Sequence, residues 1–204
     1  MIVTLTANPA VDRAIRIDRP IRRGDVHRAV AVGDQAGGKG VNVARALAHA
    51  GVATVAILPA DDDDLLVRSL REVGAFPVNV PVGHGTRLNI KVVEPDGSTT
   101  TFNDPGTPEP ESVRSALAAA LLARSRGALW VAMSGSLPPG TPDDWYATLT
   151  AALHAEGRRV AVDTSGAPLA ATLAAGELPD LLKPNAEELA SLTGADPDAV
   201  EESP

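Results

Sequence analysis

The sequence predicts an α/β protein in which a doubly wound, mostly parallel sheet carries a small antiparallel β lid. Short apolar, β-branched segments alternate with segments of helical periodicity through most of the 204 residues. Such alternation is typical of a parallel sheet with helices on both faces. Four other segments alternate apolar and polar residues, as half-exposed strands do. We therefore expect a large buried sheet and a smaller exposed one beside it.

The expected core strands are short, and each is followed by a turn or a helix. They lie at residues 2–6, 52–58, 128–133, 159–162 and 181–182. The expected helices lie at 41–50, 65–73, 109–125, 143–156 and 167–175, with a further helix starting close to residue 183. Gly51 ends the first helix as a C-cap. The aspartates at 61–64 could bind a cation, but at a helix start they are better explained as solvated caps.

The lid strands are expected around residues 13–32 and 87–103. Residues 13–18 and 26–32 alternate in polarity and are joined by a turn at 20–25. Residues 87–93 and 98–103 flank an Asp-Gly pair, which is a strong hairpin signal. These strands would form a lid or an interface beside the main sheet.

Composition excludes several classes of function. The net charge of −8 argues against nucleic-acid or anionic-membrane partners, whose binding sites are basic. With no cysteine, the chain has no disulfide, thiolate metal site or cysteine nucleophile. The N-terminus lacks the basic and apolar regions of a signal peptide, so we expect a cytoplasmic protein.

A glycine-rich stretch at Gly37-Gly38-Lys39-Gly40-Val41-Asn42 leads directly into the first helix. Glycines let the backbone approach a ligand closely, and a helix N-terminus presents free N–H groups and a positive dipole end. Lys39 adds a full charge at the same place. The stretch matches neither the P-loop nor the dinucleotide-binding glycine pattern. It indicates a site for an anion or for a hydroxyl-rich small molecule.

Polar residues follow the ends of four expected parallel strands, at 8–12, 134–136, 163–165 and 183–188. The carboxyl ends of parallel strands share one edge of a sheet, so these groups should meet in one crevice. Asp12 could serve there as a ligand, or it could equally form an Asx turn or cap a helix. Ser134-Gly135-Ser136 is not the hydrolase nucleophile elbow. The predicted chemistry suits a polyhydroxylated, phosphorylated small molecule.

Six motifs, taken together and in order, resemble those of the PfkB, or ribokinase-like, sugar kinases. They are Asn8-Pro9-Ala10-x-Asp12, Gly37-Gly38-Lys39-Gly40-x-Asn42-x-Ala44-Arg45, Thr86-Arg87-x-Asn89-x-Lys91, Ser134-Gly135-Ser136-Leu137-Pro138-x-Gly140, Asp163-x-Ser165-Gly166 and Lys183-Pro184-Asn185-x-x-Glu188. Within the family the chain is most similar to the kinases that convert fructose 1-phosphate to fructose 1,6-bisphosphate. Kinases of tagatose 6-phosphate and fructose 6-phosphate are near relatives, and a sugar-phosphate-binding pseudokinase is the alternative outside enzymes.

The resemblance implies a kinase dependent on ATP and Mg²⁺, with a ribokinase-like fold and a lid that commonly forms a homodimer contact. It implies that the sugar hydroxyls are held by Asp12, Gly38, Lys39 and Asn42. It places Arg87, together with Lys91, on the existing phosphate, and Ser136 in the same pocket. It places three residues close to the ATP phosphates and the magnesium ion: Lys183, Asn185 and Glu188.

The chain departs from the family pattern in two loops and at its end. Residues 59–63 read Pro-Ala-Asp-Asp-Asp where a Gly-Gly-x-x-Gly turn is usual, and the lid segment 100–103 lacks an acidic residue. The family's G-A-G-D segment, which carries the catalytic aspartate, lies C-terminal of the Lys-Pro-Asn motif. We therefore expect residues 1–204 to be a truncated kinase domain with no catalytic base and little activity alone.

Overall fold

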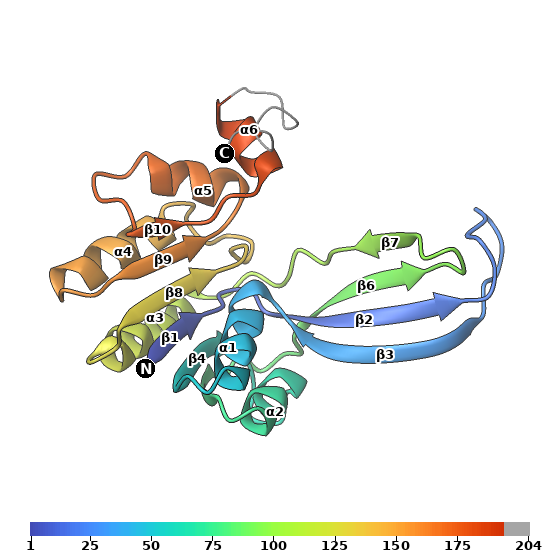
Figure 1. The fold of residues 1–204 in the computed structure, drawn as a ribbon, viewed down its shortest axis with the longest axis horizontal. Coiled ribbons are helices and arrows are strands. Elements are labelled where there is room, and N and C mark those ends of the chain that lie inside the picture. The colour runs from blue at the N-terminus through green and yellow to red at the C-terminus, as the bar shows by residue number, and fades with distance from the viewer. Residues whose placement is uncertain (194–204) are drawn as a thin grey trace.

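The computed structural model describes residues 1–193 and contains two β-sheets, with helices packed around the larger one. Figure 1 shows the large sheet and its helices as one body, from which the small sheet projects as a long arm. No helix among the described residues is long and apolar enough to cross a membrane. The predicted fold class is confirmed, although the small sheet and one edge of the large sheet differ from expectation.

The large sheet has six strands, and all neighbouring strands in it run parallel. Their order is β10 (Leu181–Leu182), β9 (Val160–Asp163), β8 (Trp130–Ser134), β1 (Ile2–Leu5), β4 (Thr54–Pro59) and β5 (Phe76–Val80). The chain adds β4 and β5 on one side of β1, then returns to add β8, β9 and β10 on the other. Doubly wound sheets bind ligands at such a reversal, outside the carboxyl ends of the strands.

Helices cover both faces of the large sheet. The helices are α1 (Lys39–His49), α2 (Leu65–Glu72), α3 (Glu111–Ser125), α4 (Trp145–Ala155), α5 (Gly166–Leu173) and α6 (Ala186–Thr193). One face carries α1 and α2, whose buried side chains form a cluster with β4. The other face carries α3 and α4, and α5 packs beside α4. This two-sided covering explains why the central strands read as continuous apolar runs.

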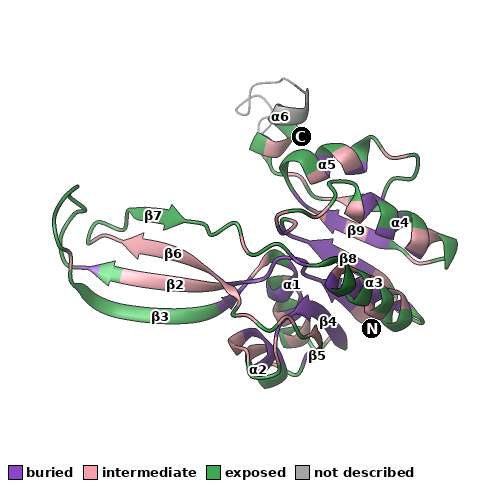
Figure 2. Ribbon diagram, turned by 180° about the vertical axis from the view of Figure 1, so that it is seen from behind, coloured by how far each residue is buried: buried purple, intermediate pink, exposed green. Residues whose placement is uncertain are grey.

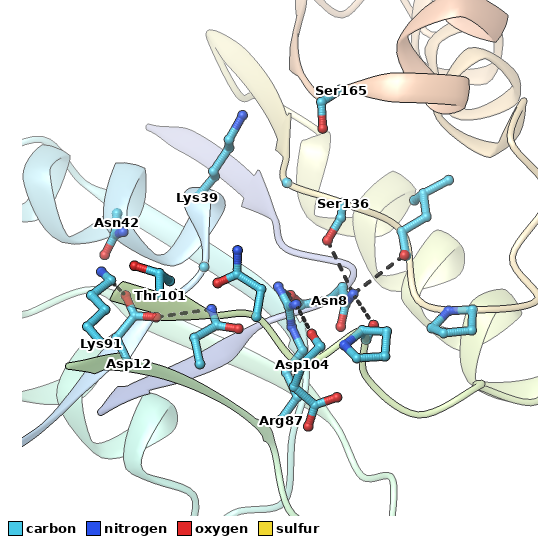
Figure 3. A pocket seen from close by; sticks show the side chains of 17 residues that line it. Asn8, Asp12, Lys39, Asn42, Arg87, Lys91, Thr101, Asp104, Ser136 and Ser165 are labelled. Atoms are coloured by element: carbon cyan, nitrogen blue, oxygen red, sulfur yellow. Dashed lines mark hydrogen bonds and ion pairs between the residues drawn. The ribbon is translucent and has the colours of Figure 1, made fainter. Parts of the chain in front are cut away.

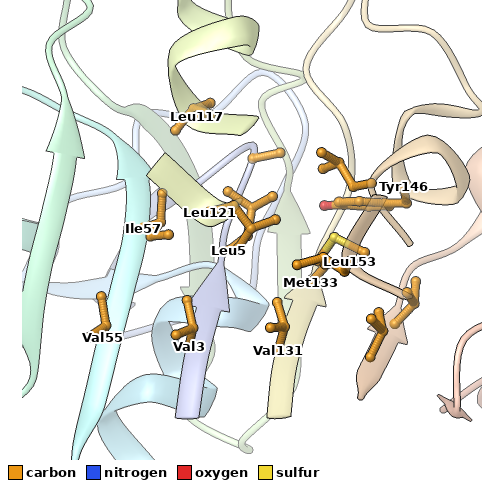
Figure 4. Packing of buried hydrophobic residues seen from close by; sticks show 14 of the residues in the cluster. Val3, Leu5, Val55, Ile57, Leu117, Leu121, Val131, Met133, Tyr146 and Leu153 are labelled. Atoms are coloured by element: carbon orange, nitrogen blue, oxygen red, sulfur yellow. The ribbon is translucent and has the colours of Figure 1, made fainter. Parts of the chain in front are cut away.

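The main core lies between the large sheet and the pair α3 and α4 (Figure 4). Leu5 and Met133 from neighbouring strands pack there with Leu121 of α3 and Leu153 of α4. Burial of each such side chain stabilises the fold by about 1.5–3 kcal/mol. The central strands are therefore rigid supports for the loops that follow them.

The small sheet has the strand order β3 (Ala29–Gly37), β2 (Ala10–Ile17), β6 (Arg87–Val93) and β7 (Thr99–Phe102). The pairs β2–β3 and β6–β7 are antiparallel, as the sequence predicts. The central pair β2–β6 is parallel, so the sheet is mixed rather than antiparallel. The reason is that two hairpins lie side by side with their first strands in the same direction.

Three details of the strands differ from the predictions. The second lid strand is expected at residues 26–32, but β3 begins at Ala29 and continues to Gly37. Asp12 is expected in the turn after the first strand, but it lies within β2. The strand β5 is not predicted, because Pro77 interrupts its pattern. Proline is tolerated there because β5 is the edge strand of the large sheet.

Side chains alternate between the two faces of the small sheet, which gives it one polar and one apolar face. The polar face carries the register partners Asp12 and Asn89, and the pair Lys91 and Thr101. The apolar face carries Val11, Ile15, Val32, Leu88, Ile90, Val92 and Phe102, together with one ion pair, Arg13–Asp34. Figure 2 shows that most of this arm is exposed or only partly buried. The helices of the main body leave both faces largely uncovered.

Candidate active site

A cavity of about 790 Å³ lies where the small sheet meets the loops after β1 and β8. All seven residues predicted to contact the sugar phosphate line it: Asp12, Gly38, Lys39, Asn42, Arg87, Lys91 and Ser136. Figure 3 shows that the labelled side chains come from the lid strands, from the start of α1 and from the loops of the large sheet. The cavity therefore combines residues that are far apart in the sequence.

The start of α1 forms one wall of the cavity because Gly40 lets the helix pack closely on β1. A Cβ at Gly40 would lie 2.3 Å from Thr6 Oγ1 and 2.8 Å from the Leu5 carbonyl oxygen. Only glycine fits this contact, since real Cβ atoms do not approach so closely. The close packing brings the first turn of α1, with Lys39 and Asn42, to the carboxyl end of the sheet.

The lid contributes a connected set of polar side chains centred on Asp12. Asn89 Nδ2 donates to Asp12 Oδ1 at 3.1 Å, and Lys91 Nζ lies 3.4 Å from Asp12 Oδ2. The parallel register of β2 and β6 fixes these contacts, because Asp12 pairs with Asn89. The carboxylate keeps acceptor capacity for a ligand hydroxyl, and the ammonium of Lys91 keeps donors for a ligand oxygen.

Arg87 lies at the base of the lid, and backbone carbonyls hold its guanidinium. Its Nη2 donates to the Asn8 carbonyl oxygen at 3.0 Å, its Nε contacts the carbonyls of Asn8 and Pro9 at 3.2 Å, and its Nη1 donates to the Asp104 carbonyl. Burial lowers the pKa of Arg87, while the negative charges of Asp104 and Asp12 act in the opposite direction. Two of its five N–H donors remain for an anion.

The turn after β8 brings Ser136 to the cavity, and buried hydroxyls hold this turn from behind. Tyr146 Oη and Thr164 Oγ1 donate to the Gly135 carbonyl oxygen at 3.2 and 3.0 Å. Burial, together with the negative charge of Asp163, raises the pKa of Tyr146, so its hydroxyl stays a neutral donor. The core therefore fixes the turn that presents Ser136.

The ammonium of Lys39 points away from Asp12 and toward the large sheet. Lys39 Nζ lies 2.9 Å from Asp163 Oδ1 and 3.8 Å from Glu188 Oε1. Figure 3 shows its side chain directed toward Ser165, away from the Asp12–Lys91 pair. Lys39 thus lines the cavity and connects it to the strand ends beyond, where its charge is paired with two carboxylates.

The three residues predicted to lie close to ATP follow β10 and are not among the cavity-lining residues. Glu188 Oε2 accepts from the backbone N–H of Asn185 at 2.9 Å, and Asn185 Oδ1 accepts from the N–H of Glu188 at 2.7 Å. This reciprocal pair is a capping box that starts α6. Lys183 is exposed beside it. Only Glu188 reaches toward the cavity, through its contact with Lys39.

The residues present are compatible with a magnesium site that a ligand's phosphates would complete. Within residues 1–193 no three His, Cys, Asp or Glu side chains are grouped so that they alone could hold a metal. Mg²⁺ is usually bound by one or two carboxylates together with water and substrate phosphates. Asp163 and Glu188 both face Lys39 Nζ and supply such carboxylates.

Several cavity residues are not among the predicted sugar-phosphate contacts. Asn89 and Ser165 stand in two of the quoted motifs, two positions after Arg87 and Asp163. This spacing could have indicated that they line the same cavity. Asn8, Gly135 and Leu137 also stand in the quoted motifs, and Asn8 begins the stretch 8–12 that is expected to reach the crevice. No sequence signal distinguishes the rest, since they lie in irregular loops or pair across strands: Thr101, Asn103, Asp104, Pro105 and Pro139. Their position depends on the three-dimensional path of the lid.

The doubly wound sheet, the β lid and the polar cavity between them define a ribokinase-like protein. The pfkB family of carbohydrate kinases matches residues 5–203, and the chain belongs to this family.

The chain is 42% identical over 197 residues to a 1-phosphofructokinase of Xanthomonas campestris pv. campestris, covering 94% of the chain and 62% of that relative. It is 37% identical to the ATP-dependent 6-phosphofructokinase isozyme 2 of Escherichia coli K12, with the same coverage. The crystal structure of Escherichia coli phosphofructokinase-2 in complex with fructose-6-phosphate superposes with a TM-score of 0.87 at 34% identity, covering 98% of the chain and 67% of that structure. The chain thus spans about three fifths of the curated relatives it matches.

Proposed function

We propose that this protein is a sugar-phosphate kinase and that the cavity binds a ketohexose phosphate, fructose 1-phosphate. One observation carries the proposal: a single cavity holds both a carboxylate for sugar hydroxyls and two cations for a phosphate. A carboxylate, amides and hydroxyls suit a sugar, whereas an arginine and a lysine suit a phosphate. Family membership supports the same conclusion.

In this proposal the lid and the start of α1 hold the sugar ring. Asp12 accepts hydrogen bonds from ring hydroxyls, and its contacts with Asn89 and Lys91 keep the carboxylate oriented. Asn42 and the backbone at Gly38 contact further hydroxyls, since both line the same wall. These contacts orient the ring before the reaction, which is how positioning lowers a reaction barrier.

The phosphate already on the sugar binds at the base of the lid. Arg87 offers its two unused N–H groups, and Ser136 and Lys91 face the same cavity. An anion there would offset the cost of burying the guanidinium, which is the cause of the lowered pKa of Arg87. Charge-assisted hydrogen bonds of this kind are about twice as strong as neutral ones.

The phosphate donor would lie at the other end of the cavity, beside Asp163 and Glu188. ATP with Mg²⁺ supplies the phosphoryl group and neutralises its developing charge when bound. Lys39 occupies the junction between the two ends, with its ammonium 2.9 Å from Asp163. Its ammonium therefore places a positive charge at the boundary between the sugar and the donor. Lys183 and Asn185, which follow β10, would lie beside the donor's phosphates.

The particular sugar phosphate can be tested by thermal shift. Equal millimolar concentrations of fructose 1-phosphate, fructose 6-phosphate and tagatose 6-phosphate are compared, with free fructose as the control. We expect the largest rise in Tm with fructose 1-phosphate, because the relative that is 42% identical is a 1-phosphofructokinase. A larger rise with fructose 6-phosphate would transfer the assignment to the second relative, and no rise with any phosphate would contradict the proposal.

We infer further that the 204 residues bind the sugar phosphate without transferring phosphate. The carboxylate assigned to the sugar hydroxyls, Asp12, is already paired with Asn89 and Lys91, and it lies at the end of the cavity away from the proposed phosphate donor. We therefore assign it to binding and orientation, not to proton transfer. An assay of ATP-dependent phosphorylation of fructose 1-phosphate by the purified chain tests this. Turnover at a rate typical of kinases, about 1–100 s⁻¹, would overturn it.

The apolar face of the small sheet supports a proposal about assembly, namely a homodimer formed through the lid. Val32 and Phe102 on this face are each 58% exposed, whereas the valines Val3 and Val131 of the large sheet are fully buried. An uncovered apolar sheet face is typical of an interaction surface. A second copy would cover it with the same face and leave the opposite, polar face to the ligand.

The dimer can be tested by sedimentation velocity at micromolar concentration. We expect the wild-type chain to sediment as a dimer and Val32→Asp to sediment as a monomer. Ala31→Asp is the control, since Ala31 directly precedes Val32 on β3 and its side chain lies on the polar face of the sheet. Monomeric wild-type protein, or equal dissociation by both variants, would exclude this interface.

A further inference from the structure

We propose that the buried side-chain amide of Asn8 positions both phosphate-binding groups of the cavity, orienting Ser136 directly and Arg87 through the loop that contacts both. The inference rests on the proposed sugar-phosphate site. It adds a residue, Asn8, to which no contact with the sugar phosphate is assigned. Asn8 lies in the turn between β1 and β2 and is only 7% exposed. It lines the cavity, and Figure 3 shows it between Ser136 and Arg87.

The Asn8 amide connects loops that come from three different parts of the chain. Its Nδ2 lies 3.0 Å from the Pro105 carbonyl oxygen, 3.2 Å from Ser136 Oγ and 3.4 Å from the Leu137 carbonyl oxygen. Two of these partners are carbonyls, which only accept, so the nitrogen rather than the oxygen must face them. The amide is thereby fixed in one orientation, and it joins the loops after β7 and β8.

This orientation decides what the hydroxyl of Ser136 can do. Because Ser136 Oγ accepts the hydrogen bond from Asn8 Nδ2, its own O–H remains free to donate. A hydroxyl that donates into the cavity suits a phosphate oxygen, which is an acceptor. If the group at position 8 were an acceptor, the Ser136 hydroxyl would donate its hydrogen bond to that group. Only a lone pair of Ser136 Oγ would then face the anion.

The backbone at the same position holds Arg87. The Asn8 carbonyl oxygen accepts from Arg87 Nη2 at 3.0 Å and from Nε at 3.2 Å. The loop after β7 closes the arrangement, since Arg87 also donates to the Asp104 carbonyl. Gly106 in that loop has a φ of 91°, and a Cβ there would lie 2.6 Å from Asn8 Oδ1. The same Cβ would lie 3.3 Å from Arg87 Cδ, so the loop after β7 packs closely on the side chains of both Asn8 and Arg87.

The test compares Asn8→Asp with a matched control, Asn79→Asp. Asn79 Nδ2 also donates to a carbonyl oxygen and to a side-chain oxygen, those of Ala60 and Asp62, each at 3.0 Å, but it lies away from the cavity. Affinity for fructose 1-phosphate is measured by calorimetry at pH 8, and folding is followed by Tm. We expect Asn8→Asp to weaken binding at least about tenfold and Asn79→Asp to leave affinity within about twofold.

A pH series separates positioning from a general loss of structure. When the introduced carboxyl is protonated it regains one O–H donor, so the ratio of wild-type to Asn8→Asp affinity should fall as the pH is lowered from 8 to 5.5. Taking the ratio removes the titration of the ligand phosphate, which is common to both proteins. In a double-mutant cycle with Ser136→Ala, we expect the two losses to be clearly less than additive.

The outcomes distinguish this inference from the proposed function. If wild type binds fructose 1-phosphate and Asn8→Asp binds equally well, the inference is wrong and the proposed function stands. A constant affinity ratio across pH together with additive losses would also overturn it, since a merely structural residue behaves in that way. If wild type does not bind any sugar phosphate, the proposed function itself fails.

Discussion

The sugar end of the cavity and the end beside Asp163 hold their polar side chains in different ways. At the sugar end, Asp12, Asn89 and Lys91 contact one another across two paired strands, and Arg87 is fixed by backbone carbonyls. At the other end a single lysine from the start of α1 reaches two carboxylates, and its side chain is 46% exposed, about as much as that of Lys91 at the sugar end (45%). Sheet register organises the first end, whereas the second depends on one flexible side chain.

The difference indicates which part of the chemistry is already organised in residues 1–193. Groups held in place before binding lose little entropy when a ligand arrives, which favours affinity and orientation. An exposed ion pair contributes only about 0–1 kcal/mol and exchanges easily for a new partner. We therefore expect substitutions at the sugar end to change binding strongly and substitutions at the Asp163 end to change it little.

The largest expected effect comes from Gly40→Ala, which should damage both ends together. The new Cβ would lie 2.8 Å from the Leu5 carbonyl oxygen, so α1 must move away from β1. We expect a loss of about 3 kcal/mol in the free energy of unfolding, measured by urea denaturation. Gly33→Ala is the control, because a Cβ there meets no atom within 4 Å. Equal stability of the two variants would contradict the close helix–strand contact.

Asp12→Asn should affect only the sugar end. It removes the charge that accepts from Asn89 and Lys91, and hydrogen bonds to charged groups contribute about 1.5–3 kcal/mol. We expect fructose 1-phosphate affinity to fall about 10- to 100-fold in calorimetry. Asp34→Asn serves as the control, since Asp34 pairs with Arg13 on the opposite face of the same sheet. A loss of affinity in the control as large as in Asp12→Asn would remove the distinction between the two faces.

Lys39→Met tests the other end and should have a smaller effect on the sugar phosphate. The ammonium is paired with Asp163 and Glu188 rather than with Asp12, so its loss should weaken fructose 1-phosphate binding by no more than about fivefold. Calorimetry under the same conditions as for Asp12→Asn checks this. An effect as large as that of Asp12→Asn would place the ammonium on the sugar and erase the difference between the two ends.

The smallest effect concerns the connector that leads from β5 to Arg87. The N–H groups of Gly83 and Val82 bind the Asp61 carboxylate and hold its pKa below the ordinary value. A lowered pKa stabilises the fold above the ordinary aspartate pKa of about 3.9, and this contribution is lost as the pH falls through the folded-state value. Asp61→Asn should therefore lower Tm at pH 7, and its difference from wild type should shrink below about pH 4.

The control for this prediction is the neighbouring aspartate. Asp63→Asn should leave Tm unchanged at both pH values, because the side chain of Asp63 makes no hydrogen bond within the described residues. A pH-independent difference between wild type and Asp61→Asn would show that the carboxylate charge is not what the connector binds.

Much of the fold follows from local pattern, and the errors have physical causes. The strand at 2–5 consists of the apolar or β-branched residues Ile-Val-Thr-Leu, a composition typical of a strand buried on both faces, so it is predicted closely. By contrast, β5 contains Pro77, and its formation depends on lying at the sheet edge, which no local pattern reveals. The parallel pairing of β2 with β6 is a tertiary event between hairpins about 75 residues apart, so the sequence could not exclude an antiparallel arrangement.

The candidate site was predictable in its members but not in its contacts. The motifs predict seven sugar-phosphate contacts, and the structure brings these seven residues to one cavity. Their role in binding stays a prediction. The direction of the Lys39 side chain depends on Asp163, which is 124 positions away in the sequence. Asn8 is expected at the crevice as part of the first motif, but nothing in a linear pattern shows that the loops after β7 and β8 would both contact its amide.

The most direct test of the account is a calorimetric titration of the purified chain with fructose 1-phosphate and, separately, with fructose. The account predicts saturable binding of one fructose 1-phosphate per chain, at least about tenfold tighter than fructose, because Arg87 and Ser136 add charge-assisted contacts with the phosphate. The preference should be lost in Arg87→Met if that variant remains folded. Absence of binding, or equal affinity for the two sugars, would contradict the claim that these residues form a sugar-phosphate site.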